Sequence, residues 1–280
     1  MFLFFVFFLM FFLSFISSCC MDYLIWWSIF VISTFVFCFY FKEVVDFVFL
    51  IYYYLLQEIL GYFFLVFNNF YIQFFVLLFK SGSSPFYFWV FDLLGGLKKN
   101  SVLWFLTLQK MPYFFVIINF CSYFFFFFLF FGLLICYVHF FYLRSFLGMI
   151  LVVSTESFNW LLMFSIFSYS SVFFVFFFYY FVFFFVFPFF SNSFLNYFSL
   201  ELILIFFNIP LTLTFFIKVL VLMVFSSYGF YFLFLLFFMV VMSLGFNFWF
   251  FYNYMFSFFS YSYFSFFYYF LFPFMIVSFF

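Results

Sequence analysis

The longest apolar runs of this chain are compatible with few folds. The stretch YFFFFFLFFGLLICYVHFF, residues 123–141, is hydrophobic on every face of a helix or strand. A strand of an outer-membrane barrel instead alternates apolar and polar residues. Apolar runs of about twenty residues are typical of transmembrane helices, which satisfy their backbone hydrogen bonds within the segment. The sequence therefore predicts an all-α fold, a polytopic transmembrane helix bundle.

Composition excludes a soluble domain and argues against a metal or haem site. Hydrophobic residues make up 74% of the chain and charged residues 5%, whereas about a quarter of the residues of a soluble domain are charged. The five cysteines form no CxxC pair and no ligand spacing: Cys19, Cys20, Cys38, Cys121 and Cys136. A haem-binding membrane subunit needs several axial histidines, and His139 is the one histidine here. We therefore expect no metal site and no haem site.

The amino-terminal residues predict a first helix and not a targeting segment. Residues 1–17 lack the basic region and the small-residue cleavage site of a secretory signal, and no Arg-rich presequence is present. The chain contains 81 Phe and 24 Tyr, whose codons can be rich in thymine. This bias indicates a gene in a T-rich genome and predicts a mitochondrially encoded protein.

Breaks in the apolar pattern divide the chain into eleven predicted spans. They are residues 2–18, 23–41, 44–66, 69–96, 101–119, 121–141, 144–165, 168–188, 196–226, 229–249 and 261–280. The fourth and ninth are too long for one crossing and contain KSGSSP (80–85) and NIPLT (208–212). We expect both to be helices broken within the membrane, where freed backbone groups need protein or water around them.

The basic residues of the predicted loops all fall on one side of the membrane. They are Lys42, Lys98, Lys99 and Arg144. By the positive-inside rule this side is the matrix, the mitochondrial counterpart of the cytoplasm. The amino terminus is then expected in the matrix, and Phe280 on the other face.

Five charged residues lie inside the predicted spans and away from their ends: Lys80, Lys110, Lys218, Glu58 and Glu156. Each costs roughly 2.5–3.5 kcal/mol at a helix centre, so each must face protein or water. Lys110 lies near the middle of span 101–119, about 14 Å from either end, which is beyond the reach of a lysine stem. We therefore interpret these residues as proton-transfer groups.

Purely structural interpretations stay open for four of the five. Lys80 and Lys218 lie beside predicted helix breaks, where an ammonium can also satisfy orphan carbonyls. Glu58 and Glu156 have hydroxyl and amide neighbours that can solvate a neutral acid. In the proton-transfer interpretation, burial disfavours the charged form of a lysine and a nearby carboxylate favours it. The movement of one charge therefore makes the neighbouring group take up or release a proton.

A dense group of motifs lies between residues 80 and 110. It comprises Lys80, Gly82, Pro85-Phe86-Tyr87-Phe88-Trp89, Asp92 and Thr107-Leu108-Gln109-Lys110. This pattern resembles the subunit 2 family of mitochondrial NADH–ubiquinone oxidoreductase, respiratory complex I. Weaker similarity is present in YYLLQ (53–57), LRSFL (143–147), STESFNW (154–160) and IPLTLTFFIK (209–218). The length of the chain and its eleven predicted spans resemble the short animal form.

The resemblance implies a single antiporter-like transmembrane domain over residues 1–280, in which Lys80, Lys110 and Lys218 match proton-channel lysines. It implies a cofactor-free, proton-translocating subunit of NADH:ubiquinone reductase, with NADH, FMN, iron–sulfur clusters and ubiquinone bound by partner subunits. The expected partners are other membrane-arm subunits, the lipid bilayer and a respiratory supercomplex, with no nucleic acid. The implied location is the mitochondrial inner membrane.

The chain departs from the family pattern in its second span. The family carries a glutamate there after a tryptophan, whereas LIWWSIFVIS (24–33) offers only Ser28. Tyr87 also replaces the usual histidine, and Phe91 the usual proline. We expect Glu58 to take the place of the absent glutamate and to act on Lys80.

Two other functions fit the same sequence. A stand-alone secondary ion transporter would use KSGSSPFYFW (80–89) and NIPLTLTFFIK (208–218) as inverted repeats, since they lie five predicted spans apart. A structural scaffold subunit that conducts no protons is the second alternative, because the second-span glutamate is missing.

Overall fold

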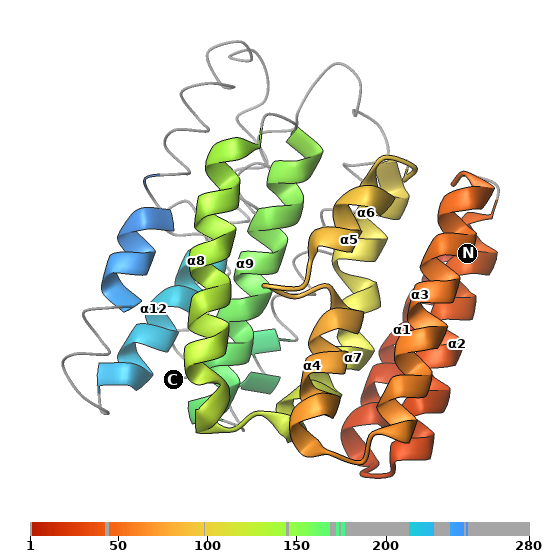
Figure 1. Ribbon diagram of the computed structural model, residues 1–280, viewed down its shortest axis with the longest axis horizontal. Coiled ribbons are helices and arrows are strands. Elements are labelled where there is room, and N and C mark those ends of the chain that lie inside the picture. The colour runs from red at the N-terminus through yellow and green to blue at the C-terminus, as the bar shows by residue number, and fades with distance from the viewer. Residues whose placement is uncertain are drawn as a thin grey trace. The chain divides into compact units, whose positions relative to one another are not determined.

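A computed structural model describes residues 2–42, 45–97, 99–143, 146–168, 172–173, 175–176, 213–226, 236–243 and 245 of the chain. Within these residues all regular structure is helical, as the sequence predicts (Figure 1). The chain divides into two compact units, Met1–Gly132 and Leu133–Phe280. Whether they form one functional domain stays a prediction.

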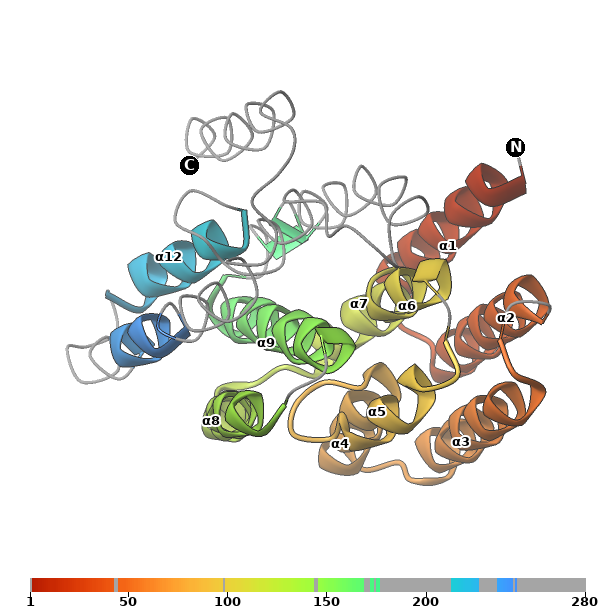
Figure 2. The same cartoon turned by 90° about the horizontal axis from the view of Figure 1, so that it is seen from above.

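Five helices of the first unit pack together. They are α1 (Phe2–Cys19), α2 (Tyr23–Phe41), α3 (Phe47–Val66), α4 (Phe70–Ser81) and α7 (Met111–Phe120). Helix α3 packs against α2 and α4, and α7 packs against α1, α2 and α4 (Figure 2). Because α7 contacts three helices, nearly all of its side chains are buried. The first unit is therefore centred on α7.

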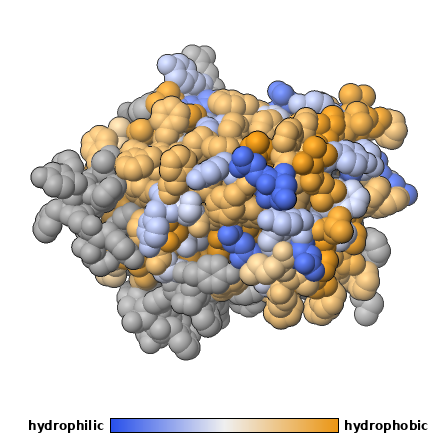
Figure 3. All heavy atoms as spheres, turned by 60° about the horizontal axis from the view of Figure 1, so that its bottom comes forward, coloured by the Kyte–Doolittle hydropathy of each residue, from blue (hydrophilic) through white to orange (hydrophobic). Residues whose placement is uncertain are grey.

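Several helices have the length and surface of membrane spans. Four segments are long and apolar enough to cross a bilayer: Tyr23–Phe41, Phe47–Val66, Tyr123–Phe140 and Gly148–Phe167. The outer face of α3 exposes apolar side chains such as Val48, Leu55 and Ile59, which suits contact with lipid. The face drawn in Figure 3 is mainly hydrophobic where it is coloured, with small hydrophilic groups between the hydrophobic ones. The membrane prediction is supported, while the count of eleven spans stays a prediction.

The predicted break in the fourth span is present. Helix α4 ends at Ser81, and the chain resumes a helix only at α5 (Phe88–Leu94). Gly82 has a left-handed backbone with φ 60° and ψ 38°, and its N–H bonds the Leu78 and Phe79 carbonyls. Glycine adopts this conformation without the penalty that a Cβ imposes, so it is a natural end to a helix.

Replacing Gly82 with Ala is expected to destabilise the first unit by about 1–2 kcal/mol, the cost of a left-handed non-glycine residue. The added Cβ would also lie 2.7 Å from Val90 Cγ2, which would have to move. Thermal denaturation of the purified protein in detergent measures the loss. Gly95→Ala is the control, because its backbone is right-handed and its Cβ would lie 3.7 Å from the Asp92 carbonyl oxygen. Equal stability of the two variants would contradict this account of the break.

The prediction of one continuous helix over 101–119 is wrong. The structure has α6 (Lys99–Leu106), a 3₁₀ turn at Leu108–Lys110 and then α7. Pro112 explains the break, because it lacks the N–H that a continuous helix would bond to the Leu108 carbonyl. The Met111 N–H bonds Leu108 O in the tighter 3₁₀ pattern instead. Lys80 and Lys110 therefore both lie at helix breaks.

The second unit is described mainly through α9 (Phe146–Phe167) and α12 (Leu213–Ser226), which pack against each other. Helix α8 (Phe126–Tyr142) begins in the first unit and ends in the second. Several predictions lie outside the described residues: the NIPLT break and its inverted repeat, most of span 168–188, the whole of span 261–280, Lys98 and Arg144.

Candidate functional site

All three intramembrane lysines predicted from the sequence are buried. Lys80 and Lys110 are 3% exposed, and Lys218 is fully buried. Lys80 and Lys110 belong to the first unit and Lys218 to the second, so the described site has two parts.

The Lys80 ammonium lies among aromatic rings. Its Nζ is 4.9 Å from the centroid of the Phe30 ring and 5.9 Å from that of Tyr113. Rings at these distances attract a cation through their negative faces. Over the part of the chain that the structure describes, Lys80 Nζ makes no hydrogen bond and no ion pair. Lys80 therefore does not satisfy the carbonyls of the broken helix.

Other groups satisfy those carbonyls. The Trp89 indole N–H donates to Phe79 O at 3.0 Å, and the Gln57 amide donates to Lys80 O at 3.1 Å. The Ser81 and Ser83 hydroxyls both donate to Leu78 O at 3.0 Å. The break is thus held by protein groups, which leaves the Lys80 ammonium available for other partners.

Buried glutamines connect the surroundings of the two lysines. Gln57 accepts a hydrogen bond from the Tyr113 hydroxyl at 3.3 Å, and Gln109, next to Lys110, donates to the Tyr53 hydroxyl at 2.7 Å. None of these four residues was among the predicted site residues. The rarity of glutamine was a sequence signal that could have identified two of them, because the chain has only three: Gln57, Gln73 and Gln109. The structure shows that all three are buried.

Glu58 lies on α3 one residue after Gln57 but is partly exposed. Over the described residues no ion pair joins it to Lys80. The hypothesis that Glu58 tunes Lys80 therefore stays a prediction.

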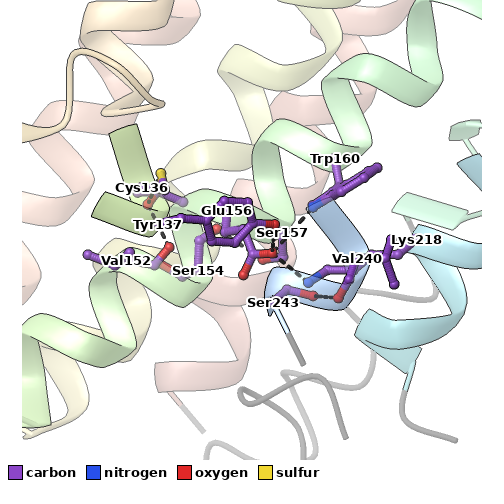
Figure 4. A network of polar contacts seen from close by, with 11 residues as sticks. Cys136, Tyr137, Val152, Ser154, Glu156, Ser157, Trp160, Lys218, Val240 and Ser243 are labelled. Carbon is purple, nitrogen blue, oxygen red and sulfur yellow. Dashed lines mark hydrogen bonds and ion pairs between the residues drawn. The ribbon is translucent and has the colours of Figure 1, made fainter. Parts of the chain in front are cut away.

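The two predicted site residues of the second unit meet directly. Lys218 Nζ lies 2.5 Å from Glu156 Oε1, and both side chains are almost completely buried (Figure 4). Glu156 comes from α9 and Lys218 from α12. The sequence identified both residues as proton-transfer candidates but did not predict that they pair.

Two further donors reach the same carboxylate oxygen. The Tyr137 hydroxyl donates to Glu156 Oε1 at 2.7 Å and the Trp160 indole N–H at 3.3 Å (Figure 4). Lys218 Nζ also lies 5.9 Å from the centroid of the Trp160 ring. Three donors around one oxygen match an ionised carboxylate, which accepts hydrogen bonds and donates none. Tyr and Trp are so abundant in this chain that the sequence did not single these two out.

The described residues contain no group of three or more His, Cys, Asp or Glu side chains that could hold a metal ion. What the arrangement offers is lysines and acids in an apolar interior, joined to amide, hydroxyl and indole groups. The lysine and carboxyl groups can take up, hold and release protons.

The chain is similar to two curated proteins of nematodes. NADH-ubiquinone oxidoreductase chain 2 of Ascaris suum is 37% identical over 209 residues, which cover 74% of this chain and 70% of that protein. NADH-ubiquinone oxidoreductase chain 2 of Caenorhabditis elegans is 34% identical over 206 residues, or 73% of each. No family model matches the chain.

Proposed function

Because this chain belongs to the NADH-ubiquinone oxidoreductase chain 2 family, we propose that it is a proton-translocating subunit in the membrane arm of respiratory complex I. Its place is the mitochondrial inner membrane, and its partners are the other subunits of that arm. Redox chemistry belongs to partner subunits that bind NADH, FMN, iron–sulfur clusters and ubiquinone. The membrane-length helices support the location.

The buried Glu156–Lys218 pair carries this proposal. A carboxylate and an ammonium in contact, both withdrawn from water, cost several kcal/mol of desolvation per ion, and an apolar pair of similar volume is often as stable. An ion pair at such a position is therefore better explained by charge movement than by stability. Lys80 and Lys110, buried at helix breaks, supply comparable sites in the first unit.

Replacing Lys110 with Met tests the proposal. Met fills a similar volume without a titratable group, so we expect an assembled complex in which proton transfer through this site slows by about 10²-fold or more. The measurement is the number of protons pumped per electron by complex I in sealed vesicles. Lys42→Met is the matched control, because Lys42 is an exposed lysine at the end of α2.

An unchanged H⁺/e⁻ ratio in an assembled Lys110→Met complex would reject proton transfer through Lys110 and favour the scaffold alternative. Mass spectrometry of native-gel bands addresses the transporter alternative. A subunit migrates with the rest of complex I, whereas a stand-alone transporter does not.

A further inference from the structure

Helix α3 carries a charged side chain far from both of its ends. Glu58 lies eleven residues after Phe47, where α3 begins, and eight before Val66, where α3 ends. At 1.5 Å per residue the nearer end is about 12 Å away, which is beyond the length of a glutamate side chain. Glu58 is partly exposed. The four other charged residues identified inside the predicted spans are buried: Lys80, Lys110, Lys218 and Glu156.

Glu58 has no polar partner in the part of the chain that the structure describes. Its carboxylate makes no hydrogen bond and no ion pair there. A charge near the centre of a membrane span is costly in lipid, and such a residue almost always faces protein or a water-filled cavity and pairs with another polar group. Glu58 therefore needs a hydrogen-bond donor that the described residues do not supply.

The side chains on either side of Glu58 have the spacing of a helix-packing surface. Val48, Ile51, Leu55, Glu58 and Tyr62 follow one another at intervals of three, four, three and four residues. We call these five residues the α3 seam. Its four other members are between 41% and 74% exposed. Alternating intervals of three and four residues keep one face of a helix against a partner helix, and a polar residue at one such position fixes the register of the pair.

The first unit leaves the outer face of α3 uncovered. Helices α2 and α4 pack against the two sides of α3 (Figure 2), and α3 is the least buried of the four membrane-length segments that the structure describes. Apolar side chains on this face suit lipid and an apolar helix surface equally, so Glu58 decides between them. The exposed stripe of α8, by contrast, is apolar throughout and suits lipid: Phe127, Phe131, Leu134 and Val138.

We propose that a transmembrane helix of another membrane-arm subunit packs along the α3 seam and donates a hydrogen bond to the Glu58 carboxylate. The partner helix presents apolar side chains to the rest of the seam and one donor side chain at the depth of Glu58. Lysine or arginine suits this position best, because each only donates and its charge balances that of the carboxylate. This inference rests on the proposed function for the place of the chain in complex I.

A high-resolution cryo-EM map of intact complex I tests the contact. We expect a helix of another subunit along the seam, with a donor nitrogen or oxygen within about 2.7–3.2 Å of a Glu58 carboxylate oxygen. Lipid over Glu58, a helix of this same chain in that place, or a partner helix without a donor at Glu58 would overturn the proposal.

Replacing Glu58 with Leu tests the same contact by assembly. Loss of one partner of a buried hydrogen-bonded charge pair should lower the ratio of complex-bound to dissociated subunit by about 30-fold. Native gels run after graded detergent treatment measure this ratio. Glu58→Gln should lose less, because the amide oxygen still accepts a hydrogen bond. Asp22→Leu is the control, because it removes an exposed acid that precedes α2 and makes no cap hydrogen bond.

The outcome for Glu58→Leu differs in direction if the seam faces lipid. Leucine is more favourable than an acid in the hydrocarbon layer, so equal or stronger retention of the Leu variant would overturn the proposal. The proposed function fails separately. An unchanged H⁺/e⁻ ratio in an assembled Lys110→Met complex rejects proton transfer and leaves the seam contact intact, whereas a lipid-covered seam rejects the contact and leaves proton transfer intact.

Discussion

Replacing Glu156 with Ala is expected to destabilise the second unit by about 3–5 kcal/mol, the usual cost of removing one partner of a buried ion pair. The substitution leaves the Lys218 ammonium, which is 0% exposed, without its carboxylate. It also removes the acceptor of the Tyr137 and Trp160 hydrogen bonds. The measurements are the yield of assembled complex on native gels and the denaturation temperature of the purified complex.

A double variant separates stability from proton transfer at this pair. Glu156→Gln with Lys218→Met removes both charges and keeps an acceptor for Tyr137 and Trp160, so we expect assembly and denaturation temperature to return close to native values. Proton pumping should stay low, because neither titratable group remains. Native-like stability of Glu156→Ala alone would show that the pair is not buried as described. Native-like pumping by the double variant would exclude the Glu156–Lys218 pair from the proposed proton path.

Replacing Gln57 with Met should cost about 2–6 kcal/mol, because it strips hydrogen bonds from two buried groups at about 1–3 kcal/mol each. These groups are the Lys80 carbonyl, left open by the end of α4, and the Tyr113 hydroxyl. Met has a similar volume, so no cavity adds to the loss. Because Gln57 bonds the backbone of Lys80, the substitution should also loosen the helix break and lower proton pumping.

Gln73→Met is the matched control. Gln73 is also buried, and its amide donates to the Phe64 carbonyl at 3.3 Å. Its loss strips one buried group and touches neither lysine, so we expect about half the destabilisation and a normal H⁺/e⁻ ratio. The protein in detergent gives the denaturation temperatures, and sealed vesicles give the pumping. Equal effects of the two substitutions on pumping would contradict a specific role for Gln57.

Local chain chemistry made several features predictable. Long apolar runs require helices in a membrane, because no other conformation lets a single segment satisfy its own backbone hydrogen bonds there. The series Ser81, Gly82, Ser83, Ser84 and Pro85 favours the end of a helix, and α4 ends at Ser81. Pro112 is a signal of the same kind for the second break, which the apolar pattern of residues 101–119 did not predict.

What the sequence by itself determined is the membrane class, the helical fold, the first helix break and which charged residues are costly enough to need a role. Only the tertiary structure decided their partners. Glu156 meets Lys218 across 62 positions of sequence, whereas Lys80 lies against aromatic rings. The reason is physical: the cost of burying a charge depends on its own segment, but its compensation depends on which helices pack beside it, and a nearly uniform apolar surface encodes that packing only weakly.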